Sequence, residues 1–279
     1  MYKLIADGGA TKTEWAVLGG ESPLRFSTKG FNPSFVKGTE LIEDILNGLP
    51  EEISQEEVEA VEYYGAGITP ALEQPIAEML AAVFYCAESI VASSDMLGAA
   101  KALLGDRPGF AAILGTGVNS CIYDGRDIVA KIPSFGFIMG DEGSGAYIGK
   151  CFLRDYIRGA QPAAVKAAAD PVVNADYSGL VERIYRGQAP NAYCASFTRF
   201  IGEHYAEDPY YGALVRASFR DFFRNIVSLY KDYTEYEFNA VGSIADVFSE
   251  DLAAVAAEFG MKVGKIIKAP LDAIVEQEI

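Results

Sequence analysis

Two turns rich in glycine and threonine constrain this chain more than any other feature of its sequence. Each turn joins two apolar runs of β-strand composition; the first spans residues 7–13 and the second residues 115–120. Glycine lets a backbone approach a ligand closely, and successive N–H groups with threonine hydroxyls form a concave site for an anion. Two such turns on matching hairpins predict a duplicated unit that holds a polyphosphate from two sides.

Composition and charge narrow the classes of protein that this chain can belong to. Half of the 279 residues are apolar and 12% are aromatic, which is enough for a buried core in one or two domains. The 23 basic and 39 acidic residues give a net charge of −16. This charge argues against nucleic-acid binding and against anionic membrane surfaces. A bound polyphosphate would need local attraction from a lysine, backbone amides and a divalent cation.

Cysteine and histidine usage excludes several kinds of site. Cys86, Cys121, Cys151 and Cys194 show no C-x-x-C pairing, so we expect free thiols and not a zinc or disulfide framework. His204 is the only histidine, which leaves aspartate and glutamate as proton acceptors. The first residues lack a signal-peptide pattern, and no apolar run approaches the roughly 20 residues that cross a bilayer. We therefore expect a cytoplasmic protein with no membrane partner.

The apolar patterns predict two α/β domains. In the first half they predict a hairpin over 2–18, strands over 24–28, 58–64 and 89–94, and helices over 39–48, 70–84 and 96–104. The pattern restarts after a hinge at 105–109, with the second turn, a glycine-rich stretch at 136–149 and mostly helices from about 145 to 234. A strand at 238–242, a helix at 244–259, a strand at 262–268 and a helix from Pro270 complete it. The predicted domains are 1–105 with 269–279, and 106–268.

The first turn is not a P-loop, because it leads into a second strand and not into a helix. In a hairpin of this composition, Asp7 can hold a hydrated Mg²⁺ while Lys12 offsets phosphate charge. The alternative is a tight β-turn that Asp and Thr side chains stabilise.

Six motifs in a fixed order resemble the N-acetylglucosamine kinase/BadF-type ATPase family of the actin-like ATPase, sugar kinase and Hsp70 superfamily. They are Asp-Gly-Gly-x-Thr-Lys-Thr from Asp7, Gly-x-Asn-Pro from Gly30, Ser-Asp-x-x-Gly-Ala from Ser94, Gly-Thr-Gly-x-Asn-Ser from Gly115, Gly-Asp-Glu-Gly-Ser from Gly140, and Gly242-Ser243. The resemblance extends from residue 3 to about residue 272. It implies two ribonuclease-H-like domains, each a mixed five-stranded sheet with helices, and an ATP cleft between them.

The resemblance also implies ATP and Mg²⁺ as cofactors, and it implies which residues bind the nucleotide. The nucleotide-binding positions fall in the first loop, the second loop and the adenosine turn: Gly8, Gly9, Thr11, Lys12 and Thr13; Gly115, Thr116 and Gly117; and Gly242 and Ser243.

Asp95 is the predicted catalytic base. Phosphoryl transfer to an alcohol depends on positioning and charge stabilisation, with a carboxylate accepting the hydroxyl proton. Asp95 follows a predicted strand and precedes a predicted helix, where it also matches the family motif. The alternative role is the N-cap of helix 96–104.

Asn32, Thr116, Asn119 and Asp141 match the sugar-binding positions, although loop stabilisation is an alternative for Asn32. Relatives that phosphorylate N-acetylglucosamine tend to have Gly-Gly-Trp-Gly where this chain has residues 133–136, Pro-Ser-Phe-Gly.

The expected function is an ATP-dependent kinase that phosphorylates an amino sugar, with the 6-hydroxyl of N-acetylglucosamine as the first expectation. The alternatives are a BadF-type ATPase activator and a sugar or nucleotide sensor without turnover. The family also suggests a homodimer.

Overall fold

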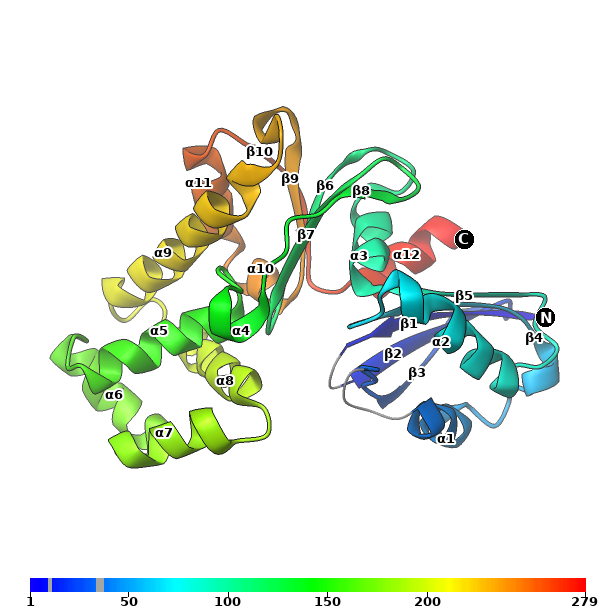
Figure 1. Cartoon of the computed structure of the whole chain (residues 1–279), viewed down its shortest axis with the longest axis horizontal. Helices are drawn as coiled ribbons and strands as arrows, with labels where there is room; N and C mark the ends of the chain where they lie inside the picture. Colours follow the sequence, from blue (N-terminus) through cyan, green and yellow to red (C-terminus); the bar gives the residue numbers. More distant parts are fainter. Residues whose placement is uncertain (10–11, 34–37) are drawn as a thin grey trace. The chain divides into compact units, whose positions relative to one another are not determined.

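The computed structural model describes residues 1–9, 12–33 and 38–279 (Figure 1). The chain divides into two compact units. Unit 1 comprises Met1–Asp106 with Ala269–Ile279, and unit 2 comprises Arg107–Lys268. None of the helices in the described part of the chain is long and apolar enough to span a membrane.

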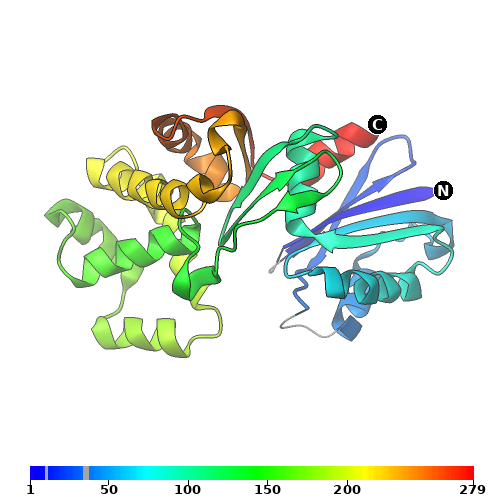
Figure 2. The ribbon, with the colours of Figure 1, turned by 45° about the horizontal axis from the view of Figure 1, so that its top comes forward.

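Unit 1 is a five-stranded mixed sheet covered by helices. Its strands are β1 (Tyr2–Gly8), β2 (Lys12–Leu18), β3 (Leu24–Lys29), β4 (Val58–Gly65) and β5 (Ser89–Ser94), in the order β3-β2-β1-β4-β5. Its helices are α1 (Gly38–Gly48), α2 (Pro70–Val83), α3 (Asp95–Leu104) and α12 (Pro270–Glu278), with a 3₁₀ turn at Gln55–Glu57. Figures 1 and 2 show α1 and α2 on one face of this sheet and α3 and α12 on the other. The carboxyl ends of β1 and β5 therefore carry Asp7 and Asp95 to one edge.

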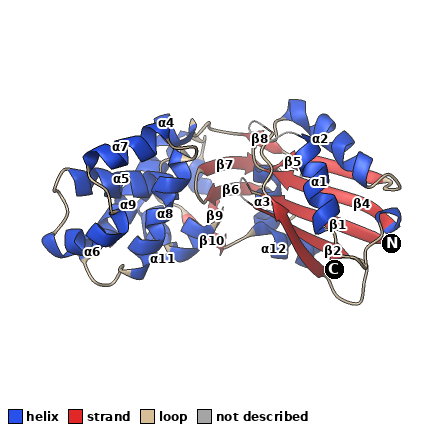
Figure 3. Ribbon diagram, turned by 90° about the horizontal axis from the view of Figure 1, so that it is seen from below, coloured by secondary structure: helices blue, strands red, loops and turns tan. Residues whose placement is uncertain are grey.

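Unit 2 contains a second five-stranded sheet and a larger set of helices (Figure 3). Its strands are β6 (Gly109–Leu114), β7 (Val118–Tyr123), β8 (Ile128–Ala130), β9 (Glu237–Val241) and β10 (Lys262–Ile267). Its helices are α4 (Gly136–Met139), α5 (Gly145–Ile157), α6 (Ala163–Val173), α7 (Tyr177–Arg186), α8 (Pro190–Glu203), α9 (Pro209–Asn225), α10 (Ser243–Val247) and α11 (Ser249–Glu258), with 3₁₀ turns at Val227–Leu229 and Tyr233–Glu235.

The two sheets have the same topology. The order in unit 2 is β10-β9-β6-β7-β8, which matches unit 1 strand for strand when it is read from β8. In both units the first three strands pair antiparallel, and the last two run parallel to the first. The predicted duplication and the predicted fold class are confirmed.

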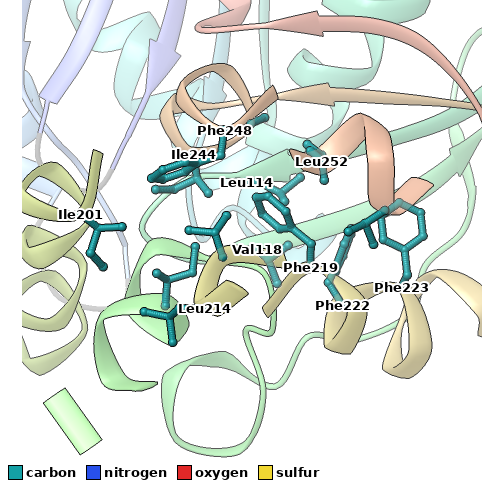
Figure 4. Close-up of a cluster of buried hydrophobic side chains, with 14 of the residues drawn as sticks. Leu114, Val118, Ile201, Leu214, Phe219, Phe222, Phe223, Ile244, Phe248 and Leu252 are labelled. Atoms are coloured by element: carbon teal, nitrogen blue, oxygen red, sulfur yellow. The ribbon is translucent and has the colours of Figure 1, made fainter. Parts of the chain in front are cut away.

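Aromatic side chains of α9 form one cluster in the core of unit 2. Phe219, Phe222 and Phe223 are fully buried, and Figure 4 shows them packed with Leu114 of β6 and Leu252 of α11. These aromatic residues therefore serve helix packing. Burial of one phenylalanine contributes about 2–3 kcal/mol, so this cluster anchors the second hairpin to α9.

Two details of the predicted elements are wrong. The helix expected over 244–259 is two helices, α10 and α11, because the backbone at Phe248 leaves the helical region (φ −112°, ψ 33°). Strand β8 was not expected, since only three residues form it at the edge of the sheet and none of them is buried.

Candidate functional site

The first turn is held by the register of the β1–β2 hairpin. Gly8 pairs with Thr13 and Asp7 with Glu14, and the Gly9 N–H donates to the Lys12 carbonyl at 2.9 Å. Lys12 Nζ forms an ion pair with the Glu14 carboxylate. Thr11, one of the predicted nucleotide-binding residues, lies outside the described residues.

Glycine is required at position 8 because of a tyrosine beneath the turn. A Cβ at Gly8 would lie 2.7 Å from the Tyr63 hydroxyl. Tyr63 of β4 is fully buried, and burial raises its pKa to about 12, so it is a neutral hydroxyl under the turn. Sequence reasoning did not find Tyr63; its position in an apolar strand resembled that of any core residue.

The Asp7 carboxyl has a strongly perturbed pKa. Burial first of all, together with the negative charges of Asp95 and Glu14, raises this pKa from 3.8 to about 7. The structure therefore brings Asp7 and Asp95 close enough for their charges to interact. Acids that are pushed toward the neutral form by burial and by a neighbouring carboxylate are typical of functional sites.

Asp95 is the first residue of α3, and Ser94 is its N-cap. The Ser94 Oγ accepts a hydrogen bond from the Leu97 N–H at 3.3 Å, while Asp95 Oδ1 accepts one from the Met96 N–H at 2.8 Å. The alternative interpretation of Asp95 as the N-cap of this helix is therefore wrong. Helix initiation does not depend on the Asp95 carboxylate, because the Ser94 hydroxyl performs that task.

The second turn is docked on the first residues of α5. The Gly145 N–H donates to the Gly115 carbonyl at 2.8 Å and the Ala146 N–H to the Thr116 carbonyl at 3.1 Å. Within the turn, the Gly115 N–H donates to the Gly117 carbonyl at 3.0 Å. A Cβ at Gly115 would meet no other atom within 4 Å, so the backbone there faces open space that a ligand can enter.

A cavity of about 240 Å³ in unit 2 joins this turn to two distant segments. Its lining residues are small or hydroxyl-bearing for the most part: Gly115, Thr116, Gly145, Ala192, Ala195, Ser196, Thr198, Ser243 and Ile244. The structure thus brings the predicted residues Gly115, Thr116 and Ser243 together. The four α8 residues were missed, and the only signal for them is a run of small side chains within an aromatic region.

Gly242 fixes the turn before Ser243. Its φ of +128° disfavours any side chain, and a Cβ there would lie 2.3 Å from the Leu114 carbonyl oxygen. Its N–H donates to the Ile267 carbonyl at 3.0 Å, which ties the turn to β10. The close approach of Gly242 to the end of β6 is what places Ser243 beside the second turn.

Asp141 lies directly beside the second turn. It is buried with a left-handed backbone (φ 58°), its N–H donates to the Ser134 carbonyl at 3.1 Å, and its carbonyl accepts from the Ser144 N–H at 3.0 Å. A Cβ at Gly117 would lie 3.2 Å from the Asp141 carboxylate. Burial raises the pKa of this carboxyl, and hydrogen bonds from Val118 and Ser134 oppose the rise.

The other predicted sugar-binding residues occupy two places. Asn119 lies in β7 opposite Ile113, and its Oδ1 accepts from the Ser120 N–H at 3.1 Å. Asn32 belongs to unit 1, where its side-chain amide packs against Gly67. Glu142, next to Asp141, accepts a hydrogen bond from the Asn225 side chain at 3.0 Å.

The described residues contain no cluster of three or more His, Cys, Asp or Glu side chains that could hold a metal ion alone. Mg²⁺ needs no such cluster, since it keeps several waters and is bound through one or two carboxylates and substrate phosphates. The partly buried Asp7, with Asp95 nearby, fits that mode of binding.

Comparison with known proteins gives a clear relationship. No protein-family model and no curated protein matches the chain. Among solved structures, a candidate N-acetylglucosamine kinase from Porphyromonas gingivalis is 35% identical, with a TM-score of 0.91 over 98% of this chain and 97% of that one.

More distant structures share the fold. A candidate N-acetylglucosamine kinase from Chromobacterium violaceum is 17% identical with a TM-score of 0.73, over 99% of this chain and 98% of that one. A ROK family glucokinase from Streptomyces griseus, in complex with glucose and AMPPNP, is 15% identical with a TM-score of 0.53, over 97% and 95% of the two chains. Together with the duplicated sheets and the motif residues at their strand ends, the full-length match shows that the chain belongs to the N-acetylglucosamine kinase/BadF-type ATPase family of actin-like sugar kinases.

Proposed function

We propose that this protein transfers the γ-phosphoryl group of ATP to the 6-hydroxyl of N-acetylglucosamine. The observation that carries the proposal is the 35% identity to the Porphyromonas gingivalis protein over nearly the whole of both chains. The motif residues in this chain are consistent with it. Asp7 and Asp95 lie at one edge of the first sheet, and Gly115, Thr116 and Ser243 line one cavity of unit 2.

In this proposal each residue has a distinct task. Asp95 accepts the proton of the attacking hydroxyl, and Lys12 and the two glycine turns surround the phosphates. Asp7 is the residue that would hold Mg²⁺, which supplies charge neutralisation on the phosphates when it is bound. The 240 Å³ cavity of unit 2 is the nucleotide cavity; Ser243 lines it, and Gly242 holds Ser243 in place. Asn32, Thr116, Asn119 and Asp141 bind the sugar through hydrogen bonds.

The direct test incubates the purified protein with Mg·ATP and N-acetylglucosamine, glucosamine, N-acetylmannosamine, N-acetylmuramic acid, glucose or no sugar. We expect ADP release and a phosphosugar, detected by mass, with N-acetylglucosamine. A phosphosugar from another member of the panel would correct the substrate. ADP release that is independent of sugar would indicate the ATPase activator, and sugar binding without turnover would indicate a sensor.

Gly242→Ala is expected to raise the KM for ATP about tenfold or more. The new Cβ would need to move away from the Leu114 carbonyl, and this displaces Ser243 from the nucleotide cavity. Gly202→Ala in α8 is the matched control, because its Cβ would make only ordinary contacts, 3.5 Å to Val247 and 3.9 Å to Phe248. Steady-state kinetics at saturating sugar measures both; an unchanged KM in Gly242→Ala would contradict the assignment of this turn.

Asn119→Ala is expected to raise the KM for the sugar about threefold to tenfold and to leave the KM for ATP unchanged. The loss corresponds to about 1 kcal/mol, the contribution of one hydrogen bond to an uncharged hydroxyl or amide group. The side-chain oxygen of Asn119 accepts a hydrogen bond from the adjacent Ser120 N–H, so we expect its loss to disturb the fold only locally. An equal rise in both KM values would place Asn119 with the nucleotide and not with the sugar.

A further inference from the structure

Unit 2 contains a second cavity that none of the predicted functional residues explains. It measures about 600 Å³ and is enclosed by α4, α5, α7 and α8, which Figure 3 shows grouped in the helical part of this unit. Its apolar wall comes from Leu153, Ile157, Leu180, Val181 and Ile184. The volume falls within the range of small-molecule sites, about 300–1,000 Å³, and no residue lines both this cavity and the nucleotide cavity.

One side of the cavity is cationic. Lys150, Arg154 and Arg158 recur at every fourth position of α5 and all line it. Lys150 Nζ donates to the Phe137 carbonyl at 2.9 Å, and Arg154 pairs with Asp155 at 2.9 Å. The Arg158 guanidinium has no hydrogen-bond or ion-pair partner among the described residues. In a chain of net charge −16, three cations on one helix face create a local attraction for an anion.

The mouth of the cavity is unusually apolar for a surface. Ile138, Tyr177 and Tyr185 line it and are 88%, 66% and 81% exposed. Clustered exposed apolar side chains mark a binding site more often than scattered ones do. Symmetric pairing of this face with a second copy would bring the cations of α5 near their own counterparts, which disfavours a dimer here. An apolar cavity with cationic groups at one wall fits a small molecule with an apolar body and an anionic group.

Helix α8 forms a wall of both cavities. Pro190 and Cys194 line the larger cavity, while Ala192, Ala195 and Ser196 line the nucleotide cavity. The backbones of α5 and α8 are in close contact, because a Cβ at Gly149 would lie 1.8 Å from the Cys194 carbonyl oxygen. A displacement of α8 by a ligand in one cavity therefore changes the shape of the other.

We propose that the cavity between α5, α7 and α8 binds a small amphipathic anion, such as an aromatic or aliphatic carboxylate, sulfonate or phosphate ester. Its occupant alters the affinity of the nucleotide cavity through α8. The proposed binding site depends only on the observed cavity, whereas the proposed effect on nucleotide affinity rests on the proposed function.

The binding step is tested by titrating the full chain with 1-anilinonaphthalene-8-sulfonate in a calorimeter. We expect saturable binding of one probe per chain. Val181→Trp, which fills the cavity, and the double substitution Arg154→Gln/Arg158→Gln should each weaken binding at least tenfold. Arg199→Gln/Arg220→Gln is the charge-matched control, since Arg199 pairs with Glu203, Arg220 pairs with Glu258 and neither arginine lines the cavity. Thermal unfolding establishes that each variant is folded.

Two results would overturn the binding site. One is equal affinity for the probe in Val181→Trp and in the unaltered protein; the other is a dimer in solution that Tyr185→Asp dissociates.

The coupling between the two cavities is tested by measuring the Kd of AMPPNP with and without saturating probe. We expect a change of at least threefold that is absent in Val181→Trp, and linkage requires the same factor in the probe's affinity. An unchanged AMPPNP Kd would overturn the effector role. Failure of AMPPNP to bind at all would instead count against the proposed kinase.

Discussion

Asp95→Asn is expected to lower kcat by about 10²–10⁴-fold, the range that a positioned proton acceptor contributes to catalysis. The amide cannot accept the proton of the sugar hydroxyl. Its oxygen can still accept the hydrogen bond that Asp95 Oδ1 receives from the Met96 N–H. We therefore expect the KM values and the thermal midpoint to change little.

A matched pair of variants separates catalysis from helix initiation. Ser94→Ala removes the N-cap of α3 and should cost about 1 kcal/mol of stability while most of kcat is retained. Asp106→Asn, at an exposed position of the same unit, controls for the loss of one negative charge. Kinetics and chemical denaturation measure all three. An Asp95→Asn protein with full kcat would rule out Asp95 as the base.

Asp7→Asn is expected to abolish turnover and, in the absence of ligands, to stabilise the protein at pH 8. Turnover is lost because the neutral amide is a poor ligand for Mg²⁺. The gain in stability follows from the pKa of Asp7, which burial and the charges of Asp95 and Glu14 raise from 3.8 to about 7. Ionising this carboxyl in the folded state therefore costs up to about 4 kcal/mol relative to the unfolded chain.

The direction of the pH dependence follows from proton uptake. Between about pH 4 and pH 7 the folded protein holds a proton at Asp7 that the unfolded chain has released. The contribution of Asp7 to the free energy of unfolding thus falls as the pH rises through this window and is constant above it. Urea unfolding of both proteins at pH 4 and pH 8 should show similar stability at the lower pH and a more stable Asp7→Asn variant at the higher.

Adding Mg·ATP to the stability measurements on the unaltered protein and Asp7→Asn tests the metal-binding role of Asp7. Mg·ATP should raise the thermal midpoint of the unaltered protein, since a cation removes the repulsion that destabilises the ionised Asp7. It should raise the midpoint of Asp7→Asn much less. If the difference in stability between the two proteins were the same at both pH values, the raised pKa of Asp7 would be wrong. A residue that is retained at a cost in stability is typical of a functional site.

The duplicated fold was predictable because it depends on local signals. The turns at 7–13 and 115–120 each lie between apolar strand patterns, and turn composition with strand periodicity is largely a property of neighbouring residues. The resemblance to the family implied two mixed five-stranded sheets, and the antiparallel β1–β2 and β6–β7 pairs with the parallel β1–β4 and β6–β9 pairs confirm them. The break between α10 and α11 was missed because both halves have helical periodicity, and Phe248 carries no breaker signal.

The candidate site was predictable only in part. Gly8, Gly115 and Gly242 could be identified from motif positions, yet the reasons for glycine there lie in distant atoms of Tyr63 and Leu114, or in open space. Asp95 was ambiguous in the sequence because an aspartate before a helix is typical of a cap; the structure gives the cap to Ser94, and the catalytic role of Asp95 stays a prediction. The role of Thr11 stays a prediction.

The sequence by itself determined the two hairpins, the motif residues and the excess of acidic charge, because each depends on residues close together in the chain or on simple counts. Only the tertiary structure decided that Asp7 is partly buried near Asp95, that Ser243 lies beside Thr116, and that α8 is a wall of two cavities. These facts arise from long-range packing, in which side chains far apart in the sequence come together. Burial and charge interaction act through space, so no local pattern in the chain specifies them.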